Sequence, residues 1–347
     1  MSTFNTTKKF KKFYKQNNSI NLIFCRLCGL QLLLSFLFFT PRIVQGDDPL
    51  ILANVPTFLT GLVAIAQDQQ YFSNRHLQLK ITSHPTGEEA MTALEKGQAD
   101  LATVAETAFV LHLFDQPDLR VLALIGSWDN DVRILARRDQ GITRPGELKG
   151  KRIGTQQRLS THFFLDQFLL KHGLGMQEVT PVFAKAPELA ENLKNGVVDA
   201  ISMRDPFISQ AQAGLGERAV LFEDPGLYEK VFLLAVLKKD LPAREAVLTR
   251  FIDALIQAES FIRQEPERAR ELLRRQDTKV ADELQRAWPD LRLRVWLDHR
   301  FILTLENVAD WAMRNQLVTS RPMPNFLNNL YTRPLQQLRP IAINLLD

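Results

Sequence analysis

The chain has 347 residues, enough for two lobes or domains, and its 45% hydrophobic and 24% charged residues are ordinary for a globular protein. The net charge of +4 suggests a basic protein, but residues 1–46 hold seven of the 43 basic side chains and none of the 39 acidic ones. The rest of the chain therefore has 36 basic and 39 acidic residues, a net charge of −3, which argues against nucleic-acid binding.

A lysine-rich stretch opens the chain and leads into the apolar run GLQLLLSFLFF at residues 29–39. A positive segment, an apolar run of about eleven residues and small side chains before a cleavage point are typical of a secretory signal peptide. Val44 and Gly46 fit the −3 and −1 positions. We therefore predict a signal peptide at 1–46 and a periplasmic protein. The alternative is an uncleaved membrane anchor over residues 20–39, although Arg26 makes that span costly.

Both cysteines, Cys25 and Cys28, lie in this leader, so the body of the chain contains none. Disulfides, cysteine nucleophiles and zinc–thiolate sites are thereby excluded from the body. The sequence also lacks a G-x-S-x-G elbow, a phosphate-loop lysine motif and an H-E-x-x-H motif, and its six histidines show no metal-ligand spacing. We expect no metal, no cofactor and no enzymatic activity.

From Pro49 onward, short β-rich runs alternate with helical stretches. Strands are predicted at 50–55, 77–83, 99–104 and 120–127, and helices between them at 59–72, 86–97 and 106–114. This alternation predicts βαβ units on a mostly parallel sheet, and so a protein of the α/β class.

The chain then repeats itself. LEKGQADLA at 94–102 aligns without gaps with LKNGVVDAI at 193–201, at an offset of 99 residues. Each segment contains a helix end, a glycine that can take the left-handed cap conformation and an acidic residue that opens a buried strand. The repeat predicts two α/β lobes of similar construction.

After Leu237 the character changes, and residues 242–315 are predicted to be almost entirely helical with charged, solvated faces. Because these helices follow the second lobe, we expect the chain to return and pack on the first. The crossings are expected near residues 137–141 and 237–240. The first lobe would then comprise 48–138 plus 239–347, and the second lobe 139–238.

In open parallel sheets, ligands bind outside the carboxyl ends of the strands. The polar loops at these ends supply the candidate ligand-binding residues, and several precede helices whose free N–H groups and positive dipole ends favour an anion or a polar oxygen. The candidates are Pro56, Thr57, Phe58, Gly87, Thr107, Ser127, Trp128, Asp129, Ser160, Thr161, His162 and Asp205.

Two of these candidates have a structural alternative. Ser160 is expected to cap the helix that starts there, which is compatible with ligand contacts from Thr161 or His162. His162 is expected to stay neutral near the positive helix end. Asp205 is equally well explained as the N-cap of a helix with proline at its first position.

The charges near these loops leave the ligand open. Arg158 and Arg204, with the helix start at Ser160, favour an anionic head group such as a sulfonate or carboxylate. Carboxylates in the loops, at Asp129, Asp131 and Asp205, would instead suit an amino group or an aminopyrimidine. We expect a small organic molecule that combines both features.

Three segments carry a family resemblance. GEEAMTALEKGQAD (87–100), GITRPGELKGKRIGTQQRLSTHFFLDQFLLKHGL (141–174) and NGVVDAISMRDPF (195–207) resemble the nitrate/sulfonate/taurine and thiamine-pyrimidine substrate-binding proteins of ABC importers. The resemblance implies the type II periplasmic-binding fold, in which two α/β lobes close by a hinge on a small-molecule solute. It also implies a monomer that works with an ABC permease in the inner membrane. The chain departs from the family pattern at Leu159, where glycine is usual, and at Arg204, where an aromatic residue is common.

Other classes of protein use the same fold. An enzyme, either a pyrimidine-precursor synthase or a chorismate-type dehydratase, is the alternative function. The synthase is expected to have a cysteine-rich, histidine-bearing segment that this chain lacks, and both enzymes suit the cytoplasm, which the leader opposes. The ligand-sensing half of a transcription regulator would need a helix-turn-helix where the leader stands.

Overall fold

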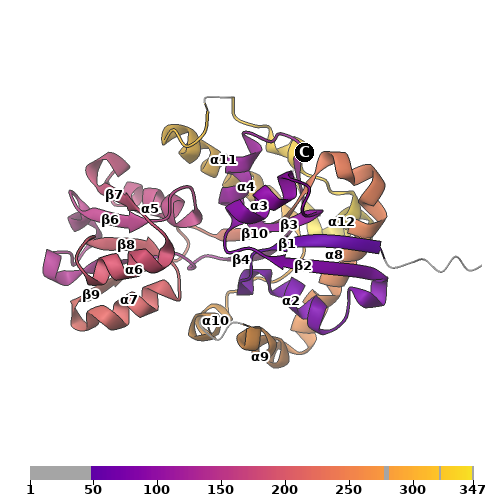
Figure 1. Ribbon diagram of the computed structural model, residues 1–347, viewed down its shortest axis with the longest axis horizontal. Helices are drawn as coiled ribbons and strands as arrows, with labels where there is room; N and C mark the ends of the chain where they lie inside the picture. Colours follow the sequence, from indigo (N-terminus) through magenta and orange to yellow (C-terminus); the bar gives the residue numbers. More distant parts are fainter. Residues whose placement is uncertain (1–47, 277–280, 320–321, 346–347) are drawn as a thin grey trace, which may run out of the picture. The chain divides into compact units, whose positions relative to one another are not determined.

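The structure, a computed structural model, describes residues 48–276, 281–319 and 322–345 (Figure 1). The predicted signal peptide and its cleavage point lie outside the described residues. Within them, no helix combines the length and the apolar character needed to cross a membrane.

The first sheet has five strands in the order β2-β1-β3-β10-β4. Its strands are β1 (Asp48–Asn54), β2 (Leu77–Ser83), β3 (Leu101–Ala105), β4 (Leu119–Trp128) and β10 (Lys230–Leu237). Strand β1 pairs in parallel with β2 and β3, whereas β10 runs antiparallel to β3 and β4. The four strands predicted from alternation are confirmed, with ends that shift by no more than about two residues.

The second sheet also has five strands, in the order β7-β6-β8-β5-β9. Its strands are β5 (Arg133–Arg137), β6 (Arg152–Thr155), β7 (Thr180–Phe183), β8 (Ala200–Met203) and β9 (Ala219–Phe222). Here β6 pairs in parallel with β7 and β8, and β5 runs antiparallel to β8 and β9. Each sheet therefore contains one reversed strand, next to an edge.

The reversed strands mark where the chain crosses between the sheets. Strand β5 belongs to the second sheet and β10 to the first, so the crossings lie at residues 129–132 and 223–229. The sequence prediction placed them near 137–141 and 237–240. Because β5 and β10 are buried along their whole length, their composition gives no sign of which sheet accepts them.

Helices fill the connections and the C-terminal part of the chain. They are α2 (Gly61–Asp68), α3 (Gly87–Glu95), α4 (Glu106–Leu113), α5 (Ser160–Lys171), α6 (Ala186–Lys194), α7 (Phe207–Leu215), α8 (Leu241–Gln264), α9 (Pro266–Gln276), α10 (Ala281–Ala287), α11 (His299–Arg314) and α12 (Arg333–Leu338). The helix predicted at 59–72 is split into a short 3-10 turn, Phe58–Thr60, and α2. Two short strands, β11 (Leu297–Asp298) and β12 (Ile343–Asn344), pair in parallel.

The two segments of the internal repeat have the same local structure. The sequence alignment pairs the end of α3 and the start of β3 with the end of α6 and the start of β8. Gly97 and Gly196 both take the left-handed conformation, with φ of +69° and +76°. Asp100 accepts a hydrogen bond from a backbone N–H of β1 (2.7 Å), and Asp199 accepts the equivalent bond from β6 (2.9 Å). Each acidic residue thus ties its strand to the first parallel strand of its own sheet.

The two faces of the second sheet belong to different cores. Leu135 of β5 packs in a cluster with α6 and α7. Its neighbours Ile134 and Ala136 point to the opposite face, where they join α5 in the same cluster as the first sheet. Helix α5 therefore connects the two sheets through one continuous apolar core. We call the first sheet with its helices the first lobe, and the second sheet with α5, α6 and α7 the second lobe (Figure 1).

The C-terminal helices pack on the first lobe, as expected. Helix α8 lies against α2, α12 against α8 and β4, and α11 against α4. Residues that precede α11 bridge to β4 through Leu124–Trp296 and Ser127–Arg292. These contacts complete the first lobe with chain that follows the second lobe in sequence.

A close backbone approach within the first lobe yields a stability prediction. A Cβ at Gly126 of β4 would lie 2.0 Å from the carbonyl oxygen of Leu59. Gly126→Ala is therefore expected to lower the free energy of unfolding by about 1–3 kcal/mol, since the backbone must shift. Urea denaturation measures this. The control is Gly146→Ala, because a Cβ added there would have no atom within 4 Å other than those of residue 146 and its two chain neighbours. Equal stability of the two variants would contradict the prediction.

Candidate functional site

A cavity of about 540 Å³ is lined by loops of both lobes, and we call it the inter-lobe cavity. The first turns of five helices reach it. They contribute Gly87 (α3), Thr107 (α4), Ser160 and Thr161 (α5), Ala186 and Pro187 (α6) and Phe207 (α7). The loops that follow the parallel strands thus converge on one space, as the rule for ligand sites in open α/β sheets predicts.

Most of these helix starts keep their N–H groups free of side-chain caps. Thr86 caps α3 by accepting from the N–H of Glu89 (3.3 Å). Helices α4, α5 and α6 have no side-chain hydrogen bond at their N-cap positions, whereas the carboxylate of Asp205 accepts from the N–H of Ser209 in the first turn of α7 (2.9 Å). Uncapped N–H groups and positive dipole ends pointing at one cavity favour an anion.

The expected cap by Ser160 does not form. Arg158 adopts a left-handed conformation (φ +63°), and Leu159 occupies the extended N-cap position. Ser160 is the first residue of α5, so its hydroxyl does not reach the N–H groups of that turn. Thr161 instead accepts from the N–H of Gln156 (3.4 Å), which holds the loop against the helix.

Positive charge dominates the side chains that line the inter-lobe cavity. Lys185 and Arg204 contribute from the second lobe and Lys230 from the first, whereas Glu89 is the one carboxylate among the described lining residues. Lys230 is buried and pairs with Asp131 at 2.6 Å. Lys185 and Arg204 have no ion-pair partner in the described part of the chain, so both charges are available to a ligand.

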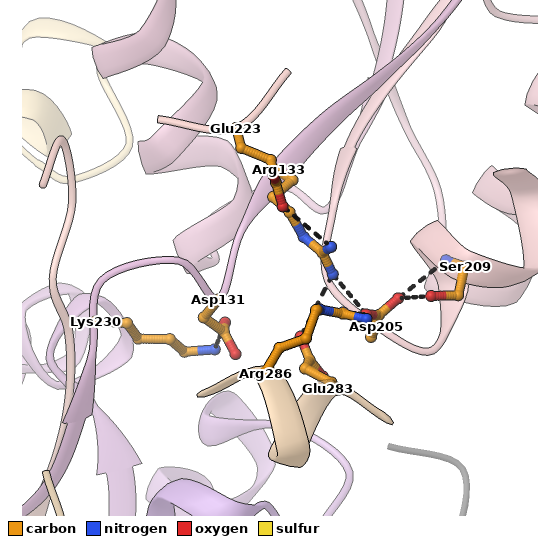
Figure 2. A network of polar contacts seen from close by, with 8 residues as sticks. All are labelled: Asp131, Arg133, Asp205, Ser209, Glu223, Lys230, Glu283 and Arg286. Carbon is orange, nitrogen blue, oxygen red and sulfur yellow. Dashed lines mark hydrogen bonds and ion pairs between the residues drawn. The ribbon is translucent and has the colours of Figure 1, made fainter. Parts of the chain in front are cut away.

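The aspartates near the inter-lobe cavity are occupied. Asp205 is buried, and its Oδ2 pairs with Arg133 (2.5 Å) and Arg286 (2.6 Å) (Figure 2). Its Oδ1 accepts from the N–H (2.9 Å) and hydroxyl (2.6 Å) of Ser209, a cap-like role in α7. Burial raises the pKa of Asp205, but the hydrogen bonds from Ser209 and the charge of Arg133 outweigh it, so the net shift is downward. Asp205 is therefore a buried, paired anion.

Glu283 of α10 completes this network. Its carboxyl is buried and lies 3.6 Å from Arg133, a longer separation than that between Arg133 and Asp205. Burial and the charges of Asp131 and Asp205 raise the pKa of Glu283 to about 8, against the opposing charges of Arg133 and Arg204. Glu283 is therefore mostly protonated at neutral pH.

A second buried acid fixes the crossing at 223–229. Glu106, at the start of α4, accepts from the hydroxyl of Tyr228 and from the N–H of Val231 (2.8 Å). Burial raises the pKa of Glu106, and burial with the charge of Glu106 raises the pKa of Tyr228. The pair holds the crossing against the first lobe. Ser160 contacts the Tyr228 hydroxyl, which connects this pair to the wall of the inter-lobe cavity.

His162 is structural in this arrangement. It is buried with its ring edge-on to Phe183 (5.1 Å) and Trp311 (5.2 Å) and does not line the inter-lobe cavity. Burial lowers the pKa of His162 to about 4, so the expected neutral form is confirmed, with burial as its cause.

The structure brings five of the twelve sequence candidates together. Thr57, Gly87, Thr107, Ser160 and Thr161 line the inter-lobe cavity. Their ligand contacts stay a prediction.

The other seven lie outside the wall of the inter-lobe cavity. Pro56 and Phe58 line a separate hollow of about 210 Å³, and Trp128 packs edge-on against Phe58 at 5.7 Å. Ser127 is buried and donates to Glu229 (2.6 Å). Asp129 is half-buried in the first crossing. Asp205 and His162 are enclosed as described above. Neighbouring protein groups therefore satisfy the side chains of Ser127 and Asp205.

Sequence reasoning missed most of the second-lobe wall, although a signal for it was present. The offset of 99 residues that relates the repeats also relates Thr86 to Lys185, Gly87 to Ala186 and Ala108 to Phe207. All six residues line the inter-lobe cavity. Extending the repeat alignment to the residues before and after the aligned segments would have predicted this wall.

Comparison with known proteins identifies the family. A model of the NMT1/THI5-like family matches residues 59–269, more than half of the chain. The chain belongs to the NMT1/THI5-like family. A relative in Escherichia coli K12, named "Putative aliphatic sulfonates-binding protein", is 25% identical over 162 residues. That match covers 46% of this chain and only half of the length of the relative.

Solved structures establish the fold of this family member. The alkanesulfonate-binding protein SsuA of Xanthomonas axonopodis pv. citri, bound to MOPS, superimposes with a TM-score of 0.69 at 19% identity. The match covers 83% of this chain and all of that one. The desulfurization enzyme DSZB also matches, with a TM-score of 0.55 at 19% identity over 84% of this chain and all of that one. The expected type II periplasmic-binding fold is confirmed, and it is shared by binding proteins and at least one enzyme.

Proposed function

We propose that the protein is the extracytoplasmic solute-binding component of an ABC importer and that it captures a small organic anion, a sulfonate or carboxylate, in the inter-lobe cavity. The observation that carries the proposal is the convergence of uncapped helix starts with Lys185 and Arg204 on that cavity. Partial positive charges of three uncapped helix ends, those of α4, α5 and α6, and two full charges lie opposite one carboxylate, Glu89.

The pairing of the aspartates removes the main argument for an amino group in the ligand. Asp131 and Asp205 already have cationic partners at 2.6 Å or closer. Drawing either toward a ligand would leave Lys230 or Arg133 as an uncompensated buried charge. The aminopyrimidine class is therefore disfavoured relative to the anion.

The remaining wall is apolar and suits an organic body. Val55, Phe207, Phe232 and Leu159 lie along the same inter-lobe cavity as the helix starts. An anionic head group at the helix ends with carbon atoms against these side chains uses both kinds of surface. A relative named for aliphatic sulfonates and a neighbour crystallised with a sulfonate buffer support this chemistry.

The enzyme alternative finds less support in the inter-lobe cavity. Among the described lining residues, Glu89 is the one carboxylate, and it is exposed beside Thr86. Of the hydroxyl groups among the described lining residues, that of Thr86 donates to Glu89 (3.4 Å) while it caps α3, and no histidine among those residues is present to act as a base. The described residues also offer no group of three acidic, histidine or cysteine side chains placed to hold a metal.

The remaining parts of the proposal rest on the leader and the family. The lysine-rich, apolar N-terminal pattern supports export to the periplasm. The partner is then an ABC permease of the inner membrane, and the binding protein acts as a monomer.

Isothermal titration of the full chain tests the ligand class. The panel is MOPS, an alkanesulfonate, an alkanecarboxylate and an uncharged aminopyrimidine, and we expect binding of one or more anions only. Arg204→Gln should weaken the anion by about tenfold or more, since a charged hydrogen bond contributes roughly 1.5–3 kcal/mol. Arg300→Gln is the matched control, because this exposed arginine pairs with Asp298 outside the inter-lobe cavity.

Two outcomes would contradict the proposal. The first is binding of the aminopyrimidine with no affinity for any anion. The second is conversion of the bound compound to a new product, followed by mass spectrometry during incubation, which would favour the enzyme.

A further inference from the structure

Helix α10 has two faces that belong to different lobes. Leu284 and Ala287 are buried in the core shared with the first sheet. The side chains of Glu283 and Arg286 instead face Arg133 and Asp205 of the second lobe. A short helix with one apolar and one polar face thus stands between the lobes.

The chain on both sides of α10 is attached to the first lobe. Before it, α9 packs on α2. After it, the backbone of Arg292 exchanges two hydrogen bonds with Ser127 of β4, at 2.9 and 3.0 Å. The Arg292 side chain also pairs with Glu229 (2.8 Å). Any movement of the second lobe relative to the first therefore leaves α10 behind.

The contacts of α10 with the second lobe are polar, and Arg286 makes their ion pair, since Glu283 is mostly protonated. Arg286 pairs with Asp205, which follows β8, at 2.6 Å. Glu283 lies 3.6 Å from Arg133 of β5. Figure 2 shows Arg133 and Arg286 converging on Asp205 from the two lobes, with Glu283 beside them.

The other junction between the lobes is apolar. Trp311 of α11 is fully buried and meets His162 and Phe163 of α5 ring to ring, at 5.2 and 5.3 Å. Separating these rings would expose apolar surface at about 25 cal/mol per Å². Because Arg286 is half exposed, water can replace Asp205 as its partner at a smaller cost than that of exposing these rings. When the lobes separate, the α10 contacts therefore open and the α5–α11 junction persists as the pivot.

The polar contacts of α10 lie next to the inter-lobe cavity. Arg204, which lines the cavity, directly precedes Asp205 in the chain. Asp131, whose charge acts on Glu283, pairs with the cavity residue Lys230. A ligand anion that contacts Arg204 would thus lie close to the ion pair of α10, because Asp205, the next residue in the chain, pairs with Arg286.

We propose that α10 is an ionic latch between the lobes, in which Arg286 pairs with Asp205 and so keeps the second lobe closed over the inter-lobe cavity. The latch slows the release of bound ligand, a consequence that rests on the proposed function. The effect of the latch on the separation of the lobes does not depend on the proposed function.

Pulsed electron paramagnetic resonance tests the latch without ligand. The full chain carries Cys25→Ser and Cys28→Ser, which leaves no other cysteine, and receives spin labels at Gln98→Cys and Val197→Cys. Both sites are exposed and occupy equivalent positions of the repeat, one in each lobe. Arg286→Gln should increase the population of long distances, and Arg286→Glu should increase it further. Arg300→Gln, whose ion pair stays within the first lobe, should match the parent.

Arg286 is about half exposed, so these variants should fold, and near-ultraviolet circular dichroism checks this. Distance distributions identical to the parent in both variants would overturn the latch. With MOPS as the probe, stopped-flow dissociation should be about two- to fivefold faster in Arg286→Gln, a loss of the size expected for a partly exposed ion pair. If MOPS and the other anions fail to bind, the proposed function fails, and the ligand-free distances still decide the latch.

Discussion

Replacing Arg133 by methionine is expected to lower the free energy of unfolding at pH 7 by about 3–5 kcal/mol. Arg133 is buried, pairs with Asp205 at 2.5 Å and lies 3.6 Å from both Glu223 and Glu283. Methionine fills a similar volume but leaves Asp205 with Arg286 as its only cationic partner among the described residues. Removing one member of a buried pair leaves a charge without compensation, which is the costly case.

Urea denaturation of the two proteins measures the difference. Arg300→Met is the control, since its exposed ion pair with Asp298 should contribute less than about 1 kcal/mol. The cost at Arg133 should shrink near pH 4, because Asp205, which has then lost one of its two cationic partners, can take up a proton more readily. A loss below about 1 kcal/mol at pH 7 would mean that water or a neighbouring group replaces Arg133.

Glu283→Gln is expected to flatten the pH dependence of stability. The pKa of Glu283 rises from 4.5 to about 8 on folding, so the folded chain holds a proton that the unfolded chain releases. Stability from this group is complete below pH 4.5 and is lost as the pH rises toward 8. Glutamine keeps the shape of the protonated acid and does not ionise.

The advantage of Glu283→Gln over the natural protein should therefore grow with pH, by up to about 1.4 kcal/mol per pH unit between these limits. Denaturant titrations at half-unit steps from pH 5 to pH 8 would measure it. Parallel stability profiles for the two proteins would contradict the predicted shift in the pKa of Glu283.

The sequence predicted the parts of the fold that depend on local pattern. Alternating apolar residues located β1 to β4, and the glycine and acidic residues of the repeat located the ends of α3 and α6. The crossings were misplaced because β5 and β10 are buried on both faces. The sequence of such a strand does not indicate its direction or the sheet to which it belongs. Both depend on the strands that flank it in the folded protein.

The site was predicted where a polar loop meets a helix start, and that rule found Ser160, Thr161 and Thr107. It failed where polar side chains prefer partners within the protein. Asp205 looked like a ligand group in the sequence, yet three residues distant in the chain or on the next turn satisfy it. Pairing of this kind depends on the approach of α10, 81 residues further along the chain, and no local pattern reports it.

The shared core has a consequence for the order in which the chain folds. The second lobe is complete in sequence at β9, but the apolar face of α5 gains its Trp311 partner only when α11 has been synthesised. The first sheet likewise waits for β10. A growing chain therefore has no finished lobe to collapse into until its C-terminal helices emerge. That delay suits the proposed export, because a polypeptide that has not yet folded can still be threaded through a narrow translocation channel.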